Sequence, residues 1–342
     1  MRRTDKLMSE AEAWALLGRA PVIHLATTTP AGEPLLRTLH AVVHQGHLCF
    51  HGARQGEKNL ALGRPAVASA EEVLARLPSW FSDPERACPA TTLFRSAMVH
   101  GQLEEVEDLE LRAEILQALM ERLQPEGGHV PISAQAPLYR GALQGIRVLR
   151  LRTGHIAGKA SLGQAWKPAQ RASVMAGLWT RGDPGDLEAL QLLAAPDPPD
   201  WLRGLEATRL LPAPGEARVE GAIALLHEQY WNQGVEPARI ATAHRHSPCW
   251  VAAVDPQGTV VGTARAIADG AKLAYVMDVA IHPAWRGRGL GRALLRLLLD
   301  HPQLRGCRRV ELHTRDAGPF YAGIGFGPMV DPAWREGWRL QR

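Results

Sequence analysis

The segment from 273 to 326 constrains the fold of this chain more than any other part of the sequence. An apolar run at 273–281 predicts a strand, and a leucine-rich run at 292–300 predicts an amphipathic helix. Between them, glycines occupy every second position from 287 to 291. Glycine lets successive backbone N–H groups approach one anion, and the positive end of the helix dipole adds to the attraction. The segment therefore predicts a turn that binds pyrophosphate.

The glycine spacing separates this turn from two common phosphate-binding motifs. A Walker loop ends in Gly-Lys followed by Ser or Thr, and this sequence has no such ending here. The glycines also follow Arg286, and their positions do not match the Gly-x-Gly-x-x-Gly pattern of dinucleotide-binding folds. An expected strand at 308–314 and an aromatic stretch at 319–326 come next, so the pattern extends well beyond a helix cap.

The complete order is a strand, Arg-x-x-Gly-x-Gly, a helix, a strand and Phe-Tyr-x-x-x-Gly-Phe. This order resembles the GNAT family of acyl-CoA-dependent N-acetyltransferases, over about Glu206 to Met329. The resemblance implies an α/β fold with a central mixed sheet, and acetyl-CoA as the cosubstrate. It also implies that backbone amides from Arg288 to Gly291 hold the pyrophosphate and that Tyr321 protonates the departing thiolate. The other acetyl-CoA contacts that it implies are Val279, Ala280 and Ile281, which pair with the pantetheine arm, and Arg286, Gly287, Gly289, Leu290, Arg292 and Asp316.

Shorter elements before this segment complete the expected module. A strand is expected at 207–211, and strands at 250–254 and 259–265 are joined by the turn Asp255-Pro256-Gln257-Gly258. Between the first two strands, 216–233 shows helical spacing. We expect one helix there, with Val219, Ile223, Leu226 and Tyr230 on one side.

Acetyl transfer needs a general base, because only the neutral amine attacks a thioester. The residues available for this role are Asp278, Glu311, His313 and Asp316. Side chains alternate between the two faces of a strand, so Asp278 is expected on the same face as Val276 and Ala280. Asp278 is the leading candidate for a catalytic residue beside Tyr321, and the sequence leaves open which face of the strand meets the cleft.

Composition describes an ordinary globular protein of two domains. The 342 residues exceed a typical single domain, and hydrophobic and charged residues make up 46% and 22% of them. The net charge of +4 is mild and the arginines are scattered, so no nucleic-acid partner is expected. Because the sequence has neither a run of eighteen apolar residues nor a signal-like start, no membrane partner is expected. Four cysteines without paired metal spacing favour a cytoplasmic protein without a metal site.

A proline-rich segment at 194–201 marks the expected domain boundary, because proline ends the preceding helix and stiffens the chain. No internal repeat relates the two halves of the sequence, so they are expected to be different domains. We therefore expect one domain at 1–203 and a second at 204–342.

The first domain has the pattern of a helix followed by the strands of a small barrel. The sequence Ser9-Glu10-Ala11-Glu12 predicts a capped start for the first helix. Strands are expected at 22–28, 34–43, 47–52, 96–106 and 146–159, with a helix after 55–59 and a clearly periodic helix at 109–123. The segment 67–72 is less apolar than a central barrel strand usually is.

This layout resembles the FMN-binding split-barrel superfamily related to pyridoxamine 5′-phosphate oxidase, and in particular its nitroimidazole-resistance-like branch. The resemblance is carried by 23–27, 50–58, 99–108 and 153–159. It implies a homodimer that shares the cofactor site through the barrel. The FMN contacts that it implies are Arg37, Thr38, Leu39 and His40 along the isoalloxazine ring, His51 near the redox site, and Arg54 and Lys58 at the phosphate. Arginine and lysine suit a dianionic phosphate, which prefers charge-assisted donors.

Together these patterns predict an α+β protein in which a split β-barrel precedes a GNAT domain. The leading hypothesis is an N-acetyltransferase of a small amine, fused to a flavin-binding barrel with reductase-like chemistry. Reduction of a nitro compound yields an amine, which would link the two domains. The alternative is a flavin- or haem-binding sensor with a non-catalytic barrel and a protein-directed or inactive GNAT domain. The acceptor, the redox substrate and the coupling between the domains stay open.

Overall fold

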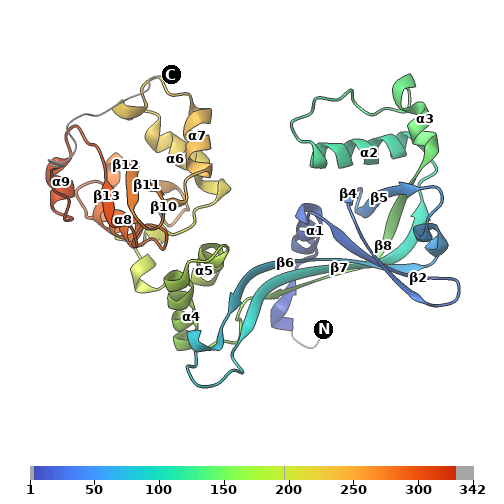
Figure 1. Ribbon diagram of the computed structural model, residues 1–342, viewed down its shortest axis with the longest axis horizontal. Coiled ribbons are helices and arrows are strands. Elements are labelled where there is room, and N and C mark those ends of the chain that lie inside the picture. Colours follow the sequence, from blue (N-terminus) through green and yellow to red (C-terminus); the bar gives the residue numbers. More distant parts are fainter. Residues whose placement is uncertain (1–3, 196, 329–342) are drawn as a thin grey trace. The chain divides into compact units, whose positions relative to one another are not determined.

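The computed structural model describes residues 4–195 and 197–328. The chain divides into two compact units, Met1–Arg171 and Ala172–Arg342 (Figure 1). Helix α4 (Pro168–Arg181) crosses this division, and the proline-rich segment at 194–201 lies in the second unit. The boundary at 203–204 between independently folding domains stays a prediction. No helix in the described ranges is long and apolar enough to cross a membrane.

The first unit is an eight-stranded antiparallel sheet that curls into a half-barrel. Its strand order is β3-β2-β6-β7-β8-β5-β4, and β1 pairs with β8 outside this path. The strands are β1 Leu7–Met8, β2 Ile23–Thr28, β3 Pro34–Leu39, β4 Val42–His44, β5 His47–Ala53, β6 Pro65–Leu77, β7 Thr91–Glu105 and β8 Ile146–Ser161. This arrangement confirms the split-barrel expectation for the N-terminal half.

At His40 and Ala41 the chain crosses from β3, at one edge of this sheet, to β4, at the opposite end of the strand order. Strands β3 and β4 follow one another in the sequence, yet they occupy opposite ends of the strand order. The single strand expected at 34–43 is therefore wrong, because one continuous strand cannot pair at both ends of the sheet. Ala41 is only 2% exposed, so this switch point is packed into the core.

The weakly apolar segment 67–72 lies in β6, which alternates between the core and the outer surface. Its core face is made of small residues, and Ala66, Ala68 and Ala70 are each at most 4% exposed. On the outer face, the Glu71 carboxylate lies 3.4 Å from His24 Nε2 of β2. A strand with one solvent-exposed face can carry polar residues at alternate positions, which explains why the segment 67–72 of β6 is only weakly apolar.

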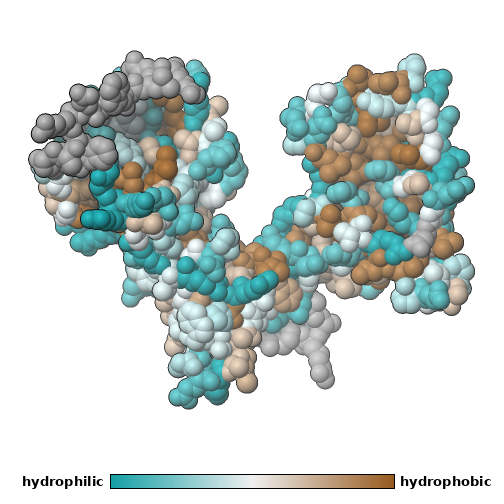
Figure 2. All heavy atoms as spheres, in the orientation of Figure 1, coloured by the Kyte–Doolittle hydropathy of each residue, from teal (hydrophilic) through white to brown (hydrophobic). Residues whose placement is uncertain are grey.

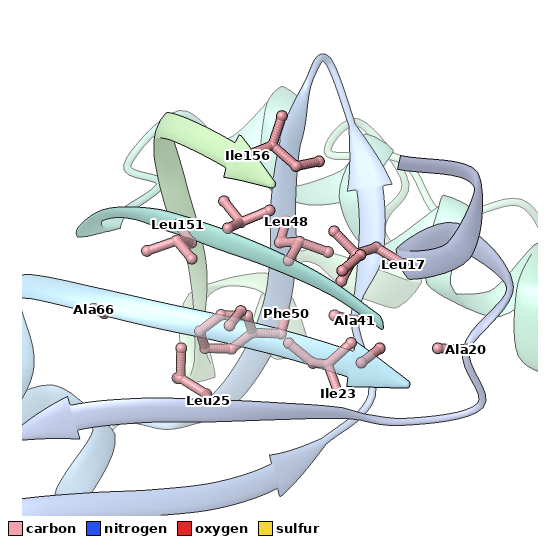
Figure 3. Packing of buried hydrophobic residues seen from close by; sticks show 14 of the residues in the cluster. Leu17, Ala20, Ile23, Leu25, Ala41, Leu48, Phe50, Ala66, Leu151 and Ile156 are labelled. Atoms are coloured by element: carbon pink, nitrogen blue, oxygen red, sulfur yellow. The ribbon is translucent and has the colours of Figure 1, made fainter. Parts of the chain in front are cut away.

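A hydrophobic core fills the curl of the sheet (Figure 3). Its largest fully buried side chains include Leu17, Ile23, Leu25, Leu48, Phe50 and Leu151. Helix α1 (Glu10–Arg19) packs against β7 and β8. Its N-terminus has the expected capping box: the Ser9 hydroxyl accepts from the Glu12 N–H at 3.2 Å, and the Glu12 carboxylate accepts from the Ser9 N–H at 2.8 Å.

Helices α2 (Leu109–Leu123) and α3 (Pro137–Gly145) form a second layer beside the half-barrel (Figure 1). The bounds of α2 are those predicted from its periodicity. Its residues Ile115 and Leu119 pack with Cys49 and Val148 in a separate small core. Hydrophobic side chains also lie at the surface of this layer (Figure 2). They are Leu109, Leu123, Val130 and Leu138, with exposed fractions between 38% and 68%.

The second unit is built on a five-stranded mixed sheet with the order β13-β12-β11-β10-β9. Its strands are β9 Arg209–Leu211, β10 Cys249–Val254, β11 Val260–Ala268, β12 Leu273–Ile281 and β13 Arg309–Glu311. Helices α6 (Val219–Leu226) and α7 (Pro237–Arg245) cover one face, and α8 (Leu290–Leu299) covers the other. Strand β10 is therefore buried along its whole length.

The helix expected at 216–233 is wrong in its length, because side-chain caps end α6 at Leu226. The Asn232 amide donates to the Leu226 carbonyl at 3.1 Å, and the Gln229 amide donates to the Leu225 carbonyl at 2.9 Å. These bonds satisfy carbonyls that a longer helix would use, and the chain leaves the helix axis. Tyr230 therefore lies in a separate 3-10 turn, η6 (Tyr230–Asn232).

The remaining elements are short. The helices are α5 Asp186–Ala194 and α9 Gly318–Ala322, and the 3-10 turns are η1 Thr4–Lys6, η2 Glu57–Ala61, η3 Ser79–Phe81, η4 Asp200–Leu202, η5 Glu216–Arg218 and η7 Pro283–Trp285. The helix expected after 55–59 is thus the 3-10 turn η2, and the strand expected at 308–314 shortens to β13.

Candidate active site

Strand β12 carries a β-bulge in the middle of the second sheet. Two of its residues, Asp278 and Val279, oppose the single residue Ala264 of β11. Asp278 has a φ of 52°, a conformation that aspartate and asparagine adopt more readily than most residues. The extra residue reverses the alternation of faces, so Val276 and Ala280 lie on opposite faces. The expectation that Asp278 shares a face with both is wrong, since alternation does not continue through a bulge.

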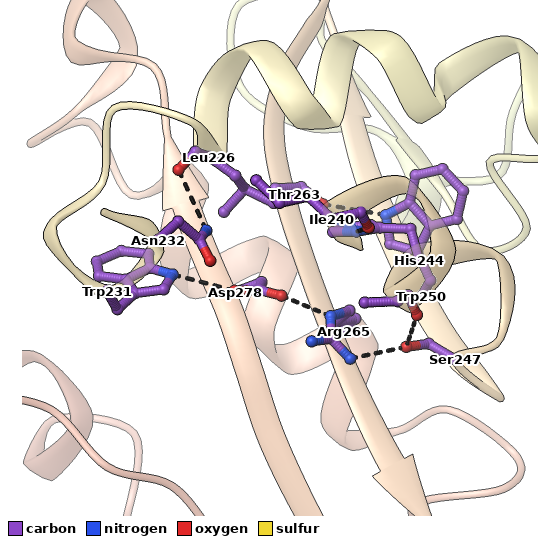
Figure 4. A network of polar contacts seen from close by, with 11 residues as sticks. Leu226, Trp231, Asn232, Ile240, His244, Ser247, Trp250, Thr263, Arg265 and Asp278 are labelled. Carbon is purple, nitrogen blue, oxygen red and sulfur yellow. Dashed lines mark hydrogen bonds and ion pairs between the residues drawn. The ribbon is translucent and has the colours of Figure 1, made fainter. Parts of the chain in front are cut away.

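The Asp278 carboxylate lies at the centre of a polar network (Figure 4). Its Oδ2 accepts from Arg265 Nε at 2.6 Å, and its Oδ1 accepts from Trp231 Nε1 at 3.0 Å. A further Arg265 nitrogen donates to the Ser247 hydroxyl at 3.0 Å. The ion-paired side chains of Arg265 and Asp278 are 11% and 9% exposed. Both oxygens of the leading base candidate are thus engaged by donors of the protein.

Strands β12 and β13 separate next to this network. Their parallel pairing ends at Tyr275 and Glu311, and the described residues show no later pairing between them. A cavity of about 700 Å³ lies beside the part of β12 that follows the bulge. The predicted acetyl-CoA residues that line it are Val279, Ala280, Ile281, Arg286, Gly287, Gly289, Gly291, Arg292 and Asp316, and the predicted catalytic residue Tyr321 lines it as well. An extended ligand with amide groups can pair with such an open strand edge.

The glycine turn closes one side of this cavity of about 700 Å³, which we call the donor cavity. Gly287 and Gly289 have φ of 72° and 91°, which favour glycine, and α8 begins directly after Gly289. Gly291 lies in the first turn of α8 with an ordinary φ, and a Cβ there would lie 3.4 Å from Ile281. The first N–H groups of a helix have no partner within the helix, so they are available to an anion.

Two predicted residues of the turn do not line the donor cavity with their side chains. The Arg288 guanidinium pairs with Glu206 at 2.6 Å, and Leu290 is 1% exposed in the core of the unit. Only their backbone amides remain for a ligand. Arg286, in contrast, lines the cavity, and its Nε donates to the carbonyl of Ile281 at the end of β12 at 2.9 Å.

Tyr321 lies on α9 beside the donor cavity. Its ring contacts those of Phe320 and Phe326 edge to face, with centroids 5.0 and 5.9 Å away. Burial and the neighbouring Tyr230 hydroxyl raise the pKa of Tyr321 above its ordinary value. Its phenol is therefore protonated at neutral pH, as a proton donor must be.

A second cavity of about 430 Å³, which we call the acceptor cavity, adjoins the first and lies over the bulge and α7. The two cavities share one wall, formed by Tyr230, Trp231, Val279, Asp316, Ala317 and Tyr321. The Arg315 guanidinium lies 3.7 Å from the centre of the Tyr230 ring, and the backbone N–H of Arg315 donates to the Tyr230 hydroxyl at 3.2 Å. This contact joins the loop after β13 to η6 beside the shared wall.

The other base candidates have different surroundings. Glu311 pairs with Arg309 at 2.7 Å, and Asp316 pairs with Arg315 at 3.7 Å. His313 lines the second cavity, and its Nδ1 shares a short hydrogen bond with the Tyr275 hydroxyl. Burial and the charge of Glu311 raise the pKa of Tyr275.

The residues predicted for FMN lie on β3, on β5 and around η2. Arg37, Thr38 and Leu39 are on the edge strand β3, and His40 follows it. The Lys58 ammonium donates to the His51 carbonyl at 3.4 Å. The pKa of His51 is lowered, mainly by burial and to a smaller extent by the nearby Lys58 and His40. The side chains of His40, His51 and Lys58 are therefore close enough to interact electrostatically. Arg54 lies on the same loop, where its carbonyl accepts from Asn59 at 2.8 Å.

Comparison with known proteins agrees with both halves of this description. The family described as pyridoxamine 5'-phosphate oxidase matches residues 9–160, and the acetyltransferase (GNAT) family matches residues 218–326. A glucosamine 6-phosphate N-acetyltransferase of Trypanosoma brucei brucei is 33% identical over 102 residues, which are 27% of this chain and 69% of that protein. The chain therefore belongs to the GNAT acetyltransferase family through its C-terminal half, and its N-terminal half is similar to the pyridoxamine 5'-phosphate oxidase family.

Each half of the chain is similar to a solved structure. A GNAT-family acetyltransferase from Xanthomonas campestris pv. campestris is 30% identical, with a TM-score of 0.36, over 40% of this chain and 96% of that one. A 5-nitroimidazole antibiotic resistance protein from Bacteroides thetaiotaomicron is 14% identical, with a TM-score of 0.36, over 45% of this chain and 86% of that one.

Several cavity residues were not among those predicted. Tyr230, Trp231, Tyr275, Arg239 and Phe320 line one or both cavities. The adjacent aromatics at 230 and 231 gave a visible signal, but helical spacing assigned them to a helix. Arg239 and Phe320 depend on where α7 and α9 pack, and Tyr275 depends on which face of β12 meets the cavity; periodicity specifies neither.

Proposed function

We propose that the second unit transfers the acetyl group of acetyl-CoA to a small primary amine. The observation that carries this proposal is the shared wall of the two cavities, with Tyr321 on it. A thioester in the larger cavity and an amine in the smaller one would meet at this wall. Bringing two reactants together in a fixed orientation is itself a large part of catalysis.

Each part of the larger cavity has a role in this reaction. The amides that open α8 hold the pyrophosphate, and the free edge of β12 at Val279–Ile281 pairs with the pantetheine amides. The amine nitrogen attacks the thioester carbonyl, a C–N bond forms, and the C–S bond then breaks. Tyr321 gives its phenolic proton to the departing sulfur, which leaves as a thiol.

The acceptor cavity favours an amine that also carries an anionic group. Arg239 lines it, and within the described ranges its guanidinium has no ion-pair partner. Asp278 and Asp316 also line it, but arginines balance both charges. An arginine without a counter-charge suits phosphate or carboxylate. The named activity of the trypanosomal relative makes glucosamine 6-phosphate the first acceptor to test.

The test is a transfer assay on the full chain with acetyl-CoA and three amines, namely glucosamine 6-phosphate, glucosamine and spermidine. Thiol release and the mass of the acetylated product are measured together. We expect glucosamine 6-phosphate, which carries an anionic group, to be turned over faster than glucosamine and faster than the polycation spermidine. Tight CoA binding without acetylation of any primary amine would contradict the proposed activity.

We also propose that the first unit binds FMN and forms a homodimer through the barrel. The similarity of residues 9–160 to the pyridoxamine 5'-phosphate oxidase family supports the flavin, and two positive side chains near β5, Arg54 and Lys58, suit its phosphate. A Cβ on Gly52 would lie 3.0 Å from Lys58 Nζ, so glycine at 52 leaves the lysine its place across β5. Bound FMN would supply hydride or electron transfer, while the barrel orients the ring and excludes water.

The visible spectrum of the purified chain tests the cofactor, and light scattering tests the dimer. Bands near about 370 and 450 nm would support FMN, and a Soret band would support the haem-binding alternative. A spectrum with neither, after reconstitution with FMN, would contradict flavin binding. Bound flavin with no reductase turnover would favour the sensor function of the barrel.

A further inference from the structure

The acceptor amine must lose a proton before it attacks, and the structure shows how the candidate bases are engaged. Both Asp278 oxygens accept hydrogen bonds, from Arg265 at 2.6 Å and Trp231 at 3.0 Å. Asp316 lies against Arg315, and Glu311 lies against Arg309. Each of these three carboxylates thus lies within ion-pair distance of an arginine of the protein itself.

His313 differs from these carboxylates in its contacts. It lines the acceptor cavity together with Tyr275, and the two rings lie with centroids 5.5 Å apart. Its Nδ1 is bonded to the Tyr275 hydroxyl. Its Nε2 has no hydrogen-bond partner in the part of the chain that the structure describes. Imidazole is the side chain whose ordinary titration suits proton transfer at neutral pH.

We propose that His313 is the general base of acetyl transfer and that Tyr275 is its positioning residue. The proposal rests on the N-acetyltransferase function proposed above. In it, the Nδ1–H donates to the Tyr275 oxygen, and this bond leaves the lone pair of Nε2 for the amine proton. The bond also fixes the ring orientation, in the way that a carboxylate or carbonyl orients many catalytic histidines.

The protons balance as follows for an ammonium substrate. One of its three protons passes to His313 Nε2, directly or through one water, and then to solvent. The neutral amine forms the C–N bond, and its nitrogen loses a second proton as the C–S bond breaks. That proton replaces the one that Tyr321 donates to sulfur. The third proton stays on the amide product.

The surroundings of His313 bear on its pH response. From β12, the Tyr275 hydroxyl faces it and, with its raised pKa, stays neutral in the assay range. From β13 and the loop after it come Glu311, Arg315 and Asp316, and Arg309 and Arg315 balance the two carboxylates. Across the cavity lie Arg239 and the Arg265–Asp278 pair. No unpaired carboxylate in the described ranges lines this cavity to compete for the amine proton.

The test compares His313→Gln and Tyr275→Phe with wild type, using the amine of the three-member panel that wild type acetylates fastest. Glutamine keeps a polar side chain and removes the base. We expect His313→Gln to lower kcat/KM at neutral pH about 100-fold, the usual scale of general-base catalysis, with unchanged acetyl-CoA affinity. We expect Tyr275→Phe to lower it about 10-fold.

The pH profile separates a base from a structural residue. Wild type should lose activity at acid pH, because a general base that is already protonated cannot accept the amine proton. In His313→Gln, kcat/KM should instead rise about tenfold per pH unit across the assay range, because the variant can use only amine that solvent has already deprotonated. His227→Gln, an exposed histidine at the end of α6 that lines neither cavity, is the matched control and keeps the wild-type profile.

Two results would overturn the proposal, and they can be told apart. If wild type acetylates an amine and His313→Gln does so within about twofold with the acid limb intact, His313 is not the base. If wild type binds CoA but acetylates none of the amines, the proposed transfer reaction fails and the base assignment fails with it.

Discussion

The Arg265 guanidinium and the Asp278 carboxylate form an ion pair of 2.6 Å that connects β11 to the bulge of β12. The carboxylate also accepts from Trp231, and the guanidinium also donates to Ser247. The pair therefore joins the bulge to η6 and to the segment after α7. Asp278 and Val279 line the acceptor cavity, and Val279 lines the donor cavity as well. The position of both cavities thus depends on this contact.

Replacing Asp278 by asparagine should destabilise the second unit by about 2–3 kcal/mol, because Arg265 loses its counter-charge in a nearly buried position. Asparagine accepts the positive φ of the bulge, so the change isolates the charge. Chemical denaturation measures the effect. Glu216→Gln, which breaks an exposed ion pair with Arg245, is the matched control and should change stability little. Equal stability of wild type and Asp278→Asn would show that the network does not depend on the charge.

The sequence predicted the parts of this site that local chemistry determines. The glycine turn, the start of α8 and the aromatic segment at 319–326 each follow from backbone freedom or side-chain periodicity over a few residues. The bulge does not, because it depends on how β12 pairs with β11. The end of α6 depends on two side-chain caps, and the change of sheet end at His40 and Ala41 depends on the closure of the curl. The bulge and the change of sheet end are set by contacts between distant segments, and the caps of α6 are local side-chain contacts that hydrophobic periodicity does not reveal.

Gly291→Ala should weaken CoA binding at least about tenfold, since losing even one charge-assisted bond to pyrophosphate costs about 1.5–3 kcal/mol. The nearest atoms to the new Cβ would be at ordinary contact distances of 3.4 and 3.5 Å, so the fold accommodates it. Gly289→Asp would also weaken binding, but a φ of 91° adds backbone strain to that change.

Calorimetry with CoA measures this affinity. The matched control is Gly141→Ala, a helical glycine of α3 with open space around its Cβ, which should bind CoA as wild type does. Unchanged affinity in a folded Gly291→Ala variant would place the pyrophosphate elsewhere.

Tyr321→Phe should lower kcat about 10- to 100-fold and leave acetyl-CoA affinity nearly constant, because the ring packing stays and only the proton donor is lost. Burial and Tyr230 raise the pKa of Tyr321, so its neutral form persists to higher pH than a free tyrosine. Wild type should therefore lose activity only at strongly alkaline pH, and this limb should vanish in the variant. Tyr139→Phe, in α3 of the other unit, is the control. A variant as fast as wild type would leave Tyr321 as a packing residue.

Lys58→Ala should weaken FMN binding by about 10- to 100-fold, because a lysine contact with a dianionic phosphate is charge-assisted. Its Nζ has a hydrogen bond to the His51 carbonyl at 3.4 Å, a long contact that a phosphate can replace. Flavin absorbance retained after dialysis measures the difference. Lys167→Ala, which removes an exposed lysine just before α4, should retain flavin as wild type does. Equal retention by both variants would remove Lys58 from the phosphate site.

His301 makes the second unit sensitive to acid. Its side chain is 1% exposed, its Nδ1 accepts from the Gln303 N–H at 3.3 Å, and its ring packs edge to face on Trp179. Burial, with a smaller effect of Arg305, lowers its pKa from 6.5 to about 4. Between these two values the unfolded chain binds a proton that the folded chain does not, so stability is full above pH 6.5 and falls as the pH drops toward 4. The loss contributed by this one group reaches about 3 kcal/mol.

In His301→Asn, the amide oxygen can take the place of Nδ1 as the acceptor for Gln303, and nothing at this position titrates. The variant should be less stable than wild type at neutral pH, because asparagine fills less of the core. Its stability should fall less steeply between pH 6.5 and about 4, the window set by His301. Denaturation at several pH values measures both slopes. The exposed His227→Asn should keep the wild-type slope, and a His301→Asn slope equal to that of wild type would mean that the buried imidazole takes up its proton without unfolding.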